Sequence, residues 1–149
     1  DWNITNNSYS LALALDEKPC YVLSSDLIIS KEIILKLDNA SPDCVLTANN
    51  ENRSLTALNC SVDENKKIDK IYQGPRSNSN DPEAVGVYKI SNSLILQKWK
   101  KNCFKHNNLF VGQNLPFAIE PIYSLDKGNH RLSEINTVLD MLNIIDIKK

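Results

Sequence analysis

The 149-residue sequence is poor in the residues from which most catalytic and ligand-binding motifs are built. It contains four glycines, which argues against the glycine-rich loops that bring backbone amides close to phosphate groups. It contains two histidines, His106 and His130, and no zinc-protease, serine-hydrolase or P-loop motif. The sequence therefore predicts no catalytic residue, no metal ligand and no cofactor, and it favours a protein without enzymatic activity over an enzyme.

Long apolar segments are also absent. No apolar run approaches the ~20 residues that cross a bilayer, so no transmembrane segment is predicted. The hydrophobic fraction of 42% and the charged fraction of 23% are typical of a globular protein. The sequence begins at Asp1 without an initiator methionine. We therefore expect a secreted or periplasmic protein whose signal peptide has been removed.

The four cysteines contain no C-x-x-C pair of the kind that zinc sites and redox motifs use. Two disulfides are therefore predicted, and with them an oxidising, extracytoplasmic compartment. A turn centred on Asn52 would place Cys44 opposite Cys60 across a hairpin, and Cys20 would then pair with Cys103. Four buried thiols in a cytosolic protein are the alternative.

Short runs of β-branched and aromatic residues predict a β-rich chain. The expected strands lie at 11–15, 21–29, 32–37, 44–48, 55–60, 68–72, 85–90, 94–99, 109–111 and 117–123. Near the C-terminus the apolar period becomes three to four residues, which predicts one amphipathic helix at about 131–146. The expected fold class is α+β: a single domain over 1–149, mostly antiparallel, forming a sandwich or open barrel of about eight short strands with that C-terminal helix.

The strongest local signal is charge. The net charge is only −1, yet the stretch 84–119 contains no Asp or Glu. Ammonium groups and aromatic rings are interleaved in its middle, where the predicted anion-binding residues are Lys98, Trp99, Lys100, Lys101, Lys105 and His106. Such a segment attracts phosphate, sulfate or carboxylate groups. A solvent-exposed edge strand, kept from aggregating by its lysines, is the alternative.

These observations predict a secreted, non-enzymatic binding protein or effector. Its partner would be an anionic surface, either phospholipid headgroups or an acidic glycan, with peripheral membrane contact. The alternative is a protein–protein interaction module, an inhibitor or an adhesin, that binds a host protein through the long polar loop 73–82. A small secreted hydrolase is a third alternative, and nucleic acid is not an expected partner because the net charge is negative.

Overall fold

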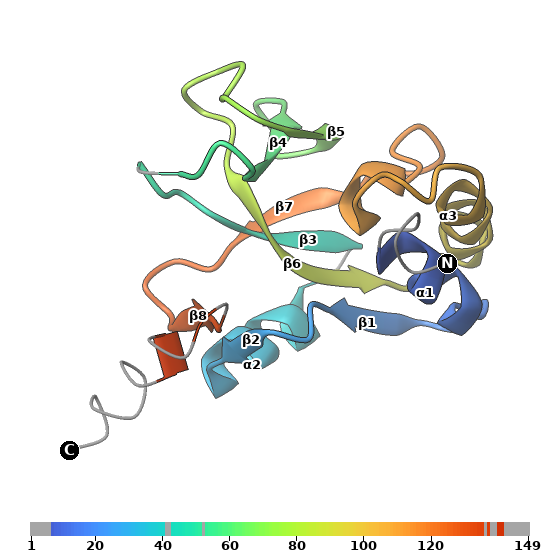
Figure 1. The fold of residues 1–149 in the computed structure, drawn as a ribbon, viewed down its shortest axis with the longest axis horizontal. Coiled ribbons are helices and arrows are strands. Elements are labelled where there is room, and N and C mark those ends of the chain that lie inside the picture. The colour runs from blue at the N-terminus through green and yellow to red at the C-terminus, as the bar shows by residue number, and fades with distance from the viewer. Residues whose placement is uncertain (1–6, 41–42, 52, 136, 138–139, 142–149) are drawn as a thin grey trace.

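The computed structural model describes residues 7–40, 43–51, 53–135, 137 and 140–141 (Figure 1). In this part of the chain the α-helices are α1 (Asn7–Ala14), α2 (Lys31–Asn39) and α3 (Ser93–Lys105), and a short 3-10 helix, η1, covers Val111–Asn114. The strands are β1 (Cys20–Leu23), β2 (Leu27–Ile29), β3 (Cys44–Ala48), β4 (Leu58–Val62), β5 (Ile68–Gln73), β6 (Glu83–Ile90), β7 (Tyr123–Asp126) and β8 (Leu132–Glu134).

The main sheet has six strands and is organised around β6. On one edge β6 pairs with β3, and β3 pairs in turn with β7. The opposite edge of β6 is shared, because its C-terminal half pairs with β1 and its first residue, Glu83, pairs with Asn59 of β4. β5 lies outside β4, while β2 and β8 form a separate two-stranded ribbon.

Four strands of the main sheet, β1, β3, β4 and β7, point the same way, and β6 runs against them. The pairing of β3 with β7 is parallel, with Cys44 opposite Tyr123 and Leu46 opposite Leu125. The carboxyl ends of these four strands therefore lie at the same end of the sheet. Open α/β sheets hold their ligands outside the carboxyl ends of strands, so a site is expected there.

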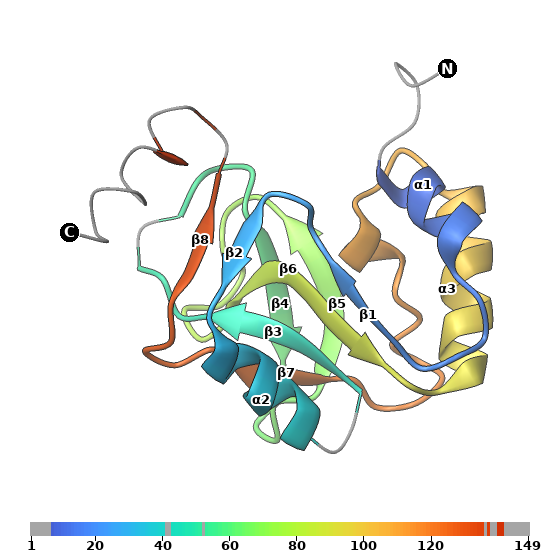
Figure 2. The ribbon, with the colours of Figure 1, turned by 90° about the horizontal axis from the view of Figure 1, so that it is seen from below.

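Helices cover both faces of the main sheet (Figures 1 and 2). On one face α1 and α3 pack on a core that includes Ala12, Ile95, Trp99, Tyr88 and Ile90. On the other face α2 packs on a second core that includes Ile33, Leu37, Leu46 and Val87. Alternate residues of β6 therefore face opposite layers, as the two-residue period of a strand requires.

Both the sequence pattern and a local cap explain why α3 is a helix. Its buried residues recur at helical spacing and are Ile95, Leu96, Trp99 and Cys103. The side-chain oxygen of Asn92 accepts hydrogen bonds from two backbone N–H groups of the first turn. Buried Asp43 holds this cap, because its carboxylate accepts bonds from the Ser91 hydroxyl and from the N–H groups of Ser91 and Asn92.

The predicted fold class is wrong. The chain is a mixed α/β protein with helices on both faces of one main sheet, not a mostly antiparallel sandwich or open barrel with a single C-terminal helix. Residues 11–14, 32–37 and 94–99, predicted as strands, lie in α1, α2 and α3. Their β-branched and leucine-rich composition is a weak preference, and packing of a helical face on the sheet overrides it.

The predicted hairpin and the start of the predicted C-terminal helix are also wrong. The hairpin between 44–48 and 55–60 does not form, because β3 lies between β6 and β7 while β4 pairs with β5. Within the helix predicted at about 131–146, residues Leu132–Glu134 form β8, which pairs with β2, and residues 140–141 are helical. Positions 136, 138–139 and 142–146 lie outside the described residues.

No helix in the described ranges is long and apolar enough to cross a membrane.

The predicted disulfides Cys44–Cys60 and Cys20–Cys103 do not exist: all four cysteines are described residues and all four are free. Cys44 and Cys60 lie on strands that pair with opposite edges of β6, so they cannot face each other. Burial raises the pKa of Cys60 to about 12 and that of Cys44 and of Cys103 to about 11. These thiols therefore stay protonated, which makes them poor nucleophiles.

Candidate functional site

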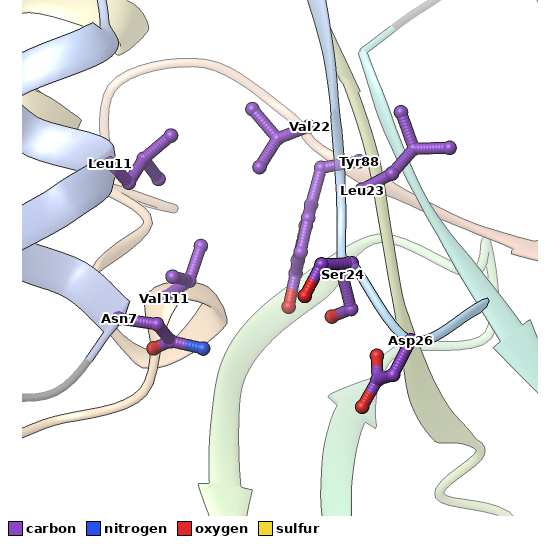
Figure 3. Close-up of a pocket in the computed structure, with 9 residues that line it drawn as sticks. Asn7, Leu11, Val22, Leu23, Ser24, Asp26, Tyr88 and Val111 are labelled. Carbon is purple, nitrogen blue, oxygen red and sulfur yellow. The ribbon is translucent and has the colours of Figure 1, made fainter. Parts of the chain in front are cut away.

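A cavity of about 320 Å³ opens at the carboxyl end of β1 (Figure 3). We call it the β1-end cavity, and its lining residues are Asn7, Leu11, Val22, Leu23, Ser24, Ser25, Asp26, Tyr88 and Val111. α1 forms one wall and the end of β1 with the turn after it forms the other, and the side chains of Val111 and Tyr88 lie between them. The cavity is thus at the end of the sheet where an α/β fold holds ligands.

Hydrogen bonds fix the helical wall of the cavity. The indole N–H of Trp99 donates to the carbonyl oxygen of Val111 over 2.9 Å and ties η1 to α3. The Ser8 hydroxyl donates to the carbonyl oxygen of Leu109 over 2.6 Å and accepts a bond of 3.0 Å from the Asn114 side chain. Trp99 and Ser8 are fully buried, so water does not compete for these bonds. These hydrogen bonds therefore hold the helical wall in place without a ligand.

Two glycines leave room for the groups at the cavity. Gly86 has φ +74°, a conformation that favours glycine, and a Cβ there would collide with the Ser24 side chain. The Gly86 carbonyl also accepts a hydrogen bond of 2.9 Å from the Ser24 N–H, which fixes the turn after β1. A Cβ at Gly112 would lie 2.6 Å from the Tyr88 hydroxyl. A larger residue at either position would displace a group that lines the cavity.

Among the described residues, Asp26 alone is a charged residue that lines the β1-end cavity. Its backbone carbonyl accepts a hydrogen bond of 2.8 Å from the N–H of Ile135, which ties the turn to the end of β8. Its half-buried carboxylate has no hydrogen-bond or ion-pair partner among the described residues. A partly desolvated charge without a protein partner favours a cation or a hydrogen-bond donor from outside the protein.

The Tyr88 hydroxyl also points into the cavity, and it has no hydrogen-bond partner in the described part of the chain (Figure 3). Only 3% of Tyr88 is exposed, and its ring packs edge-on against Trp99 at 5.6 Å between centroids. Burial raises the pKa of Tyr88 well above its ordinary value, and the thiols Cys60 and Cys103 raise it further. The hydroxyl therefore stays protonated and can donate one hydrogen bond to a ligand.

The oxygen ligands at the cavity are of the type that a hard divalent cation such as Mg²⁺ prefers. Asp26 supplies a carboxylate, and Ser24 and Ser25 in the same turn supply hydroxyl groups. Within the described ranges no cluster of three His, Cys, Asp or Glu residues could hold a metal ion without help. A cation bound at Asp26 would complete its shell with water and ligand oxygens, as Mg²⁺ commonly does beside phosphate groups.

Two of the six predicted anion-binding residues are not free at the surface. Trp99 is fully buried, and the Lys100 ammonium donates to the carbonyl oxygen of Leu15 over 2.6 Å. The exposed members, on α3 and at its end, are Lys98, Lys101, Lys105 and His106. Binding of an anionic partner by these four residues stays a prediction.

The loop 73–82, predicted from the sequence to be a recognition loop, is held by its own hydrogen bonds. Asp81 is 3% exposed, and its carboxylate accepts bonds from the Tyr72 hydroxyl at 2.6 Å and from the Asn78 N–H at 3.2 Å. The Arg53 guanidinium donates to the Asp81 carbonyl at 2.8 Å. The loop is therefore anchored to the sheet, and its binding of a host protein stays a prediction.

Sequence reasoning missed Asp26 and Tyr88. A signal for Asp26 is present, since an acidic residue follows two serines at the end of the apolar strand Cys20–Leu23. That position is a signal for a ligand site only in an α/β sheet, and the chain is expected from its sequence to be an antiparallel α+β protein. Nothing in the sequence identifies Tyr88, because its hydroxyl reaches the cavity only through the packing of β6 against α3 and η1.

No protein-family model and no curated protein matches the sequence, but solved structures match its fold. CTP:phosphocholine cytidylyltransferase from Streptococcus pneumoniae aligns with a TM-score of 0.73 and 17% identity, over 99% of this chain and 66% of that one. A putative glucose-1-phosphate thymidylyltransferase from Bacillus anthracis aligns with a TM-score of 0.69 and 13% identity, over 99% and 62%. The inositol-1-phosphate CTP transferase from T. maritima aligns with a TM-score of 0.63 and 18% identity, over 92% and 58%.

The fold is nucleotidyltransferase-like. The chain spans 66% or less of the length of each of these three structures, and the low identities establish the fold alone. The prediction of a secreted, lipid- or glycan-binding protein without enzymatic activity is contradicted, because the proteins that share the fold are transferases. The four free thiols also remove the disulfides on which a secreted or periplasmic location was predicted.

Proposed function

We propose that the β1-end cavity is part of a nucleotidyltransferase site. In this reaction an oxygen of a phosphate monoester attacks the α-phosphorus of a nucleoside triphosphate. A new P–O bond forms, the bond from the α-phosphorus to the β-phosphate breaks, and pyrophosphate leaves. One observation carries the proposal: the unpaired carboxylate of Asp26 lies at the carboxyl end of β1 in a nucleotidyltransferase-like fold.

The charge of the cavity supports a reaction that depends on a cation. Asp26 is the one charged residue among the described residues that line the cavity, and its negative charge would repel the phosphates of both substrates. Asp26 would hold Mg²⁺, which would reverse that sign and would supply charge neutralisation at the phosphate oxygens. The hydroxyl groups of Ser24 and Ser25 lie in the same turn and add oxygen ligands or hydrogen bonds.

Other groups of the cavity would orient the ligands. The protonated Tyr88 hydroxyl can donate a hydrogen bond to a ligand oxygen. The apolar side chains of Leu11, Val22 and Val111 exclude water and leave a surface for the organic part of a substrate. Because hydrogen bonds hold η1 and the turn after β1 in advance, little reorganisation is needed when ligands bind.

The nucleotide and the acceptor are tested with a panel. CTP, dTTP and UTP are each combined with phosphocholine, glucose 1-phosphate or inositol 1-phosphate in the presence of Mg²⁺. Pyrophosphate release and the mass of the product report turnover, and calorimetry reports binding of each nucleoside diphosphate product with and without Mg²⁺. At least one pair is expected to give a product, and binding of that product should require Mg²⁺.

Asp26→Asn is the decisive variant. It keeps the shape of the side chain and removes the charge that would hold the cation, so turnover should fall by about 10²-fold or more. Asp69→Asn, at an exposed carboxylate of β5 that does not line the β1-end cavity, is the matched control and should keep full activity. The proposal is wrong if no pair shows turnover or Mg²⁺-dependent product binding, or if Asp26→Asn is as active as the control.

A further inference from the structure

A second cavity, of about 140 Å³, lies between the loop 73–82 and the segment before β4. We call it the arginine cavity, because Arg53 and Arg76, two of the three arginines in the sequence, line it. Its other lining residues are Glu51, Ser54, Leu55, Asn59, Gly74 and Pro75. The proposed transferase site uses none of these residues.

Neutral oxygens hold Arg53 in place. Its guanidinium donates to the side-chain oxygen of Asn59 at 2.5 Å and to the carbonyl oxygens of Asn50 and Asp81 at 2.8 Å each. The Glu83 carboxylate lies 3.9 Å from Nε of Arg53 and accepts a shorter bond, of 2.7 Å, from the Asn50 side chain. The Arg53 side chain is only 7% exposed, so its positive charge is poorly hydrated.

Arg76 brings a second positive charge close to the first. It is exposed and donates to the carbonyl oxygens of Ser79 at 3.0 Å and Glu51 at 3.5 Å, and within the described ranges no carboxylate forms an ion pair with it. Burial lowers the pKa of Arg53, and the charge of Arg76 lowers it further. The charged lining residues are Arg53, Arg76 and Glu51, and the Glu83 carboxylate near Arg53 lies outside the lining.

We propose that the arginine cavity binds the phosphate group of a small organic phosphate. Guanidinium groups present paired N–H donors that match phosphate oxygens, and an anion between Arg53 and Arg76 relieves their repulsion. Leu55 and Pro75 line the same cavity, and Leu55 is 82% exposed, the highest value among the large apolar side chains described. These two residues give the organic part of the ligand an apolar contact that inorganic phosphate cannot use.

The arginine cavity is separate from the β1-end cavity. β4 and β1 pair with the same edge of β6, where Asn59 lies opposite Glu83 and Leu23 lies opposite Val87. The step from Glu83 to Val87 along β6 is roughly 13 Å, at ~3.3 Å per residue. A phosphate bound between the arginines is therefore not the phosphate that would react beside Asp26.

Titration of the ¹⁵N-labelled chain with phenyl phosphate and, separately, with inorganic phosphate tests the site. Both ligands should shift the backbone amide signals of Gly74 and Arg76, and phenyl phosphate should bind more tightly. Arg76→Gln should weaken both ligands about tenfold or more, because it removes charge-assisted hydrogen bonds. Leu55→Ala should weaken phenyl phosphate about threefold or more and leave inorganic phosphate unchanged, because it removes apolar contact alone.

Glu51→Gln supplies a control of the opposite sign. It removes the one negative charge from the lining and should tighten both ligands by about two- to fivefold. Wild-type affinity in Arg76→Gln, or shifts confined to Ser24–Asp26, would refute the site. Equal binding of the two ligands with no effect of Leu55→Ala would refute the organic phosphate as its ligand. These titrations need no turnover, so they are independent of the proposed transferase activity.

Discussion

The β1-end cavity and the loop 73–82 differ in whether their polar groups have hydrogen-bond partners within the protein. In the loop, buried Asp81 accepts a hydrogen bond from the Tyr72 hydroxyl, and the side chain of Asn59 donates to the loop backbone. At the cavity, Asp26 and the Tyr88 hydroxyl have no such partner among the described residues. Polar groups that are paired stabilise the fold, whereas groups left unpaired at a cavity remain free to bind a ligand. The same side-chain types therefore have different roles in the two regions.

The largest difference in the free energy of unfolding is expected between variants of two aspartates, Asp81 and Asp26. Asp81→Ala leaves the Tyr72 hydroxyl and the Asn78 N–H without their acceptor and should lower the free energy of unfolding by about 3 kcal/mol. Asp26→Ala removes no protein contact of the carboxylate and should change it by less than about 0.5 kcal/mol. Urea unfolding of both variants measures the two values. Equal losses would remove the distinction between the regions.

The next largest loss of stability is expected when one of two glycines, Gly112 and Gly74, is replaced by alanine. Gly112→Ala places a Cβ 2.6 Å from the Tyr88 hydroxyl and 3.0 Å from Ile71, so crowding should cost about 2 kcal/mol. Gly74→Ala, in the loop, meets no atom within 4 Å but has φ +109°, so only backbone strain of about 1 kcal/mol is expected. Thermal unfolding should rank the two variants, and only Gly112→Ala should also alter ligand binding at the β1-end cavity. A Gly74→Ala variant that is the less stable of the two would contradict this ranking.

Alkaline pH should lower the stability of the fold through the buried thiol of Cys60, which lies in the same core as Tyr88. The pKa of the Cys60 thiol is 9.0 before burial and about 12 in the folded protein, so the unfolded chain releases this proton first as pH rises. Stability from this thiol is complete below pH 9 and is lost as pH rises toward about 12. Between pH 8 and 10 the loss is about 1.4 kcal/mol. Cys60→Ala should show a correspondingly smaller loss over that range, and an identical pH profile would disprove the assignment.

The smallest effects come from a matched pair of tyrosines. Tyr72→Phe removes a hydroxyl that donates to Asp81 and accepts from the Ser77 N–H, and it should cost about 1 kcal/mol. Tyr88→Phe removes a hydroxyl without a protein partner and should cost less than about 0.3 kcal/mol. Chemical denaturation of both variants measures the two losses in the free energy of unfolding. If Tyr88→Phe were the more destabilising variant, its hydroxyl would be a structural group and not a ligand donor.

Strand positions in the middle of the chain could be predicted from the sequence. The strand 44–48 is confirmed as β3, and 68–72 and 85–90 fall within β5 and β6. β3 is buried at every position and β6 at most of its positions, which explains their apolar, β-branched composition. β5 buries only Ile68 and Ile71. The partners of these strands could not be predicted, since β6 pairs with strands that precede it by more than twenty residues along the chain.

The helices show where the sequence signal was ambiguous. In α1 leucine alternates with alanine, a pattern that suits a strand as well as a short helix. In α3 the run Leu94–Leu96 also suits a strand, and only the later Trp99 and Cys103 reveal the helical period. The candidate site was less accessible still, because Asn7, Asp26, Tyr88 and Val111 meet only through the tertiary packing of four elements. Of these, Asp26 alone had a local signal.

β1 also governs how molecules of this chain behave toward one another. Among the described strands it pairs with β6 alone, so its second edge carries backbone groups without a neighbouring strand. β1 contains no charged residue, and Tyr21 and Leu23 are 43% and 45% exposed. An uncharged, apolar strand edge accepts further strands by backbone pairing. Self-association that increases with protein concentration is therefore expected to begin at β1, and colloidal stability depends on what covers that edge.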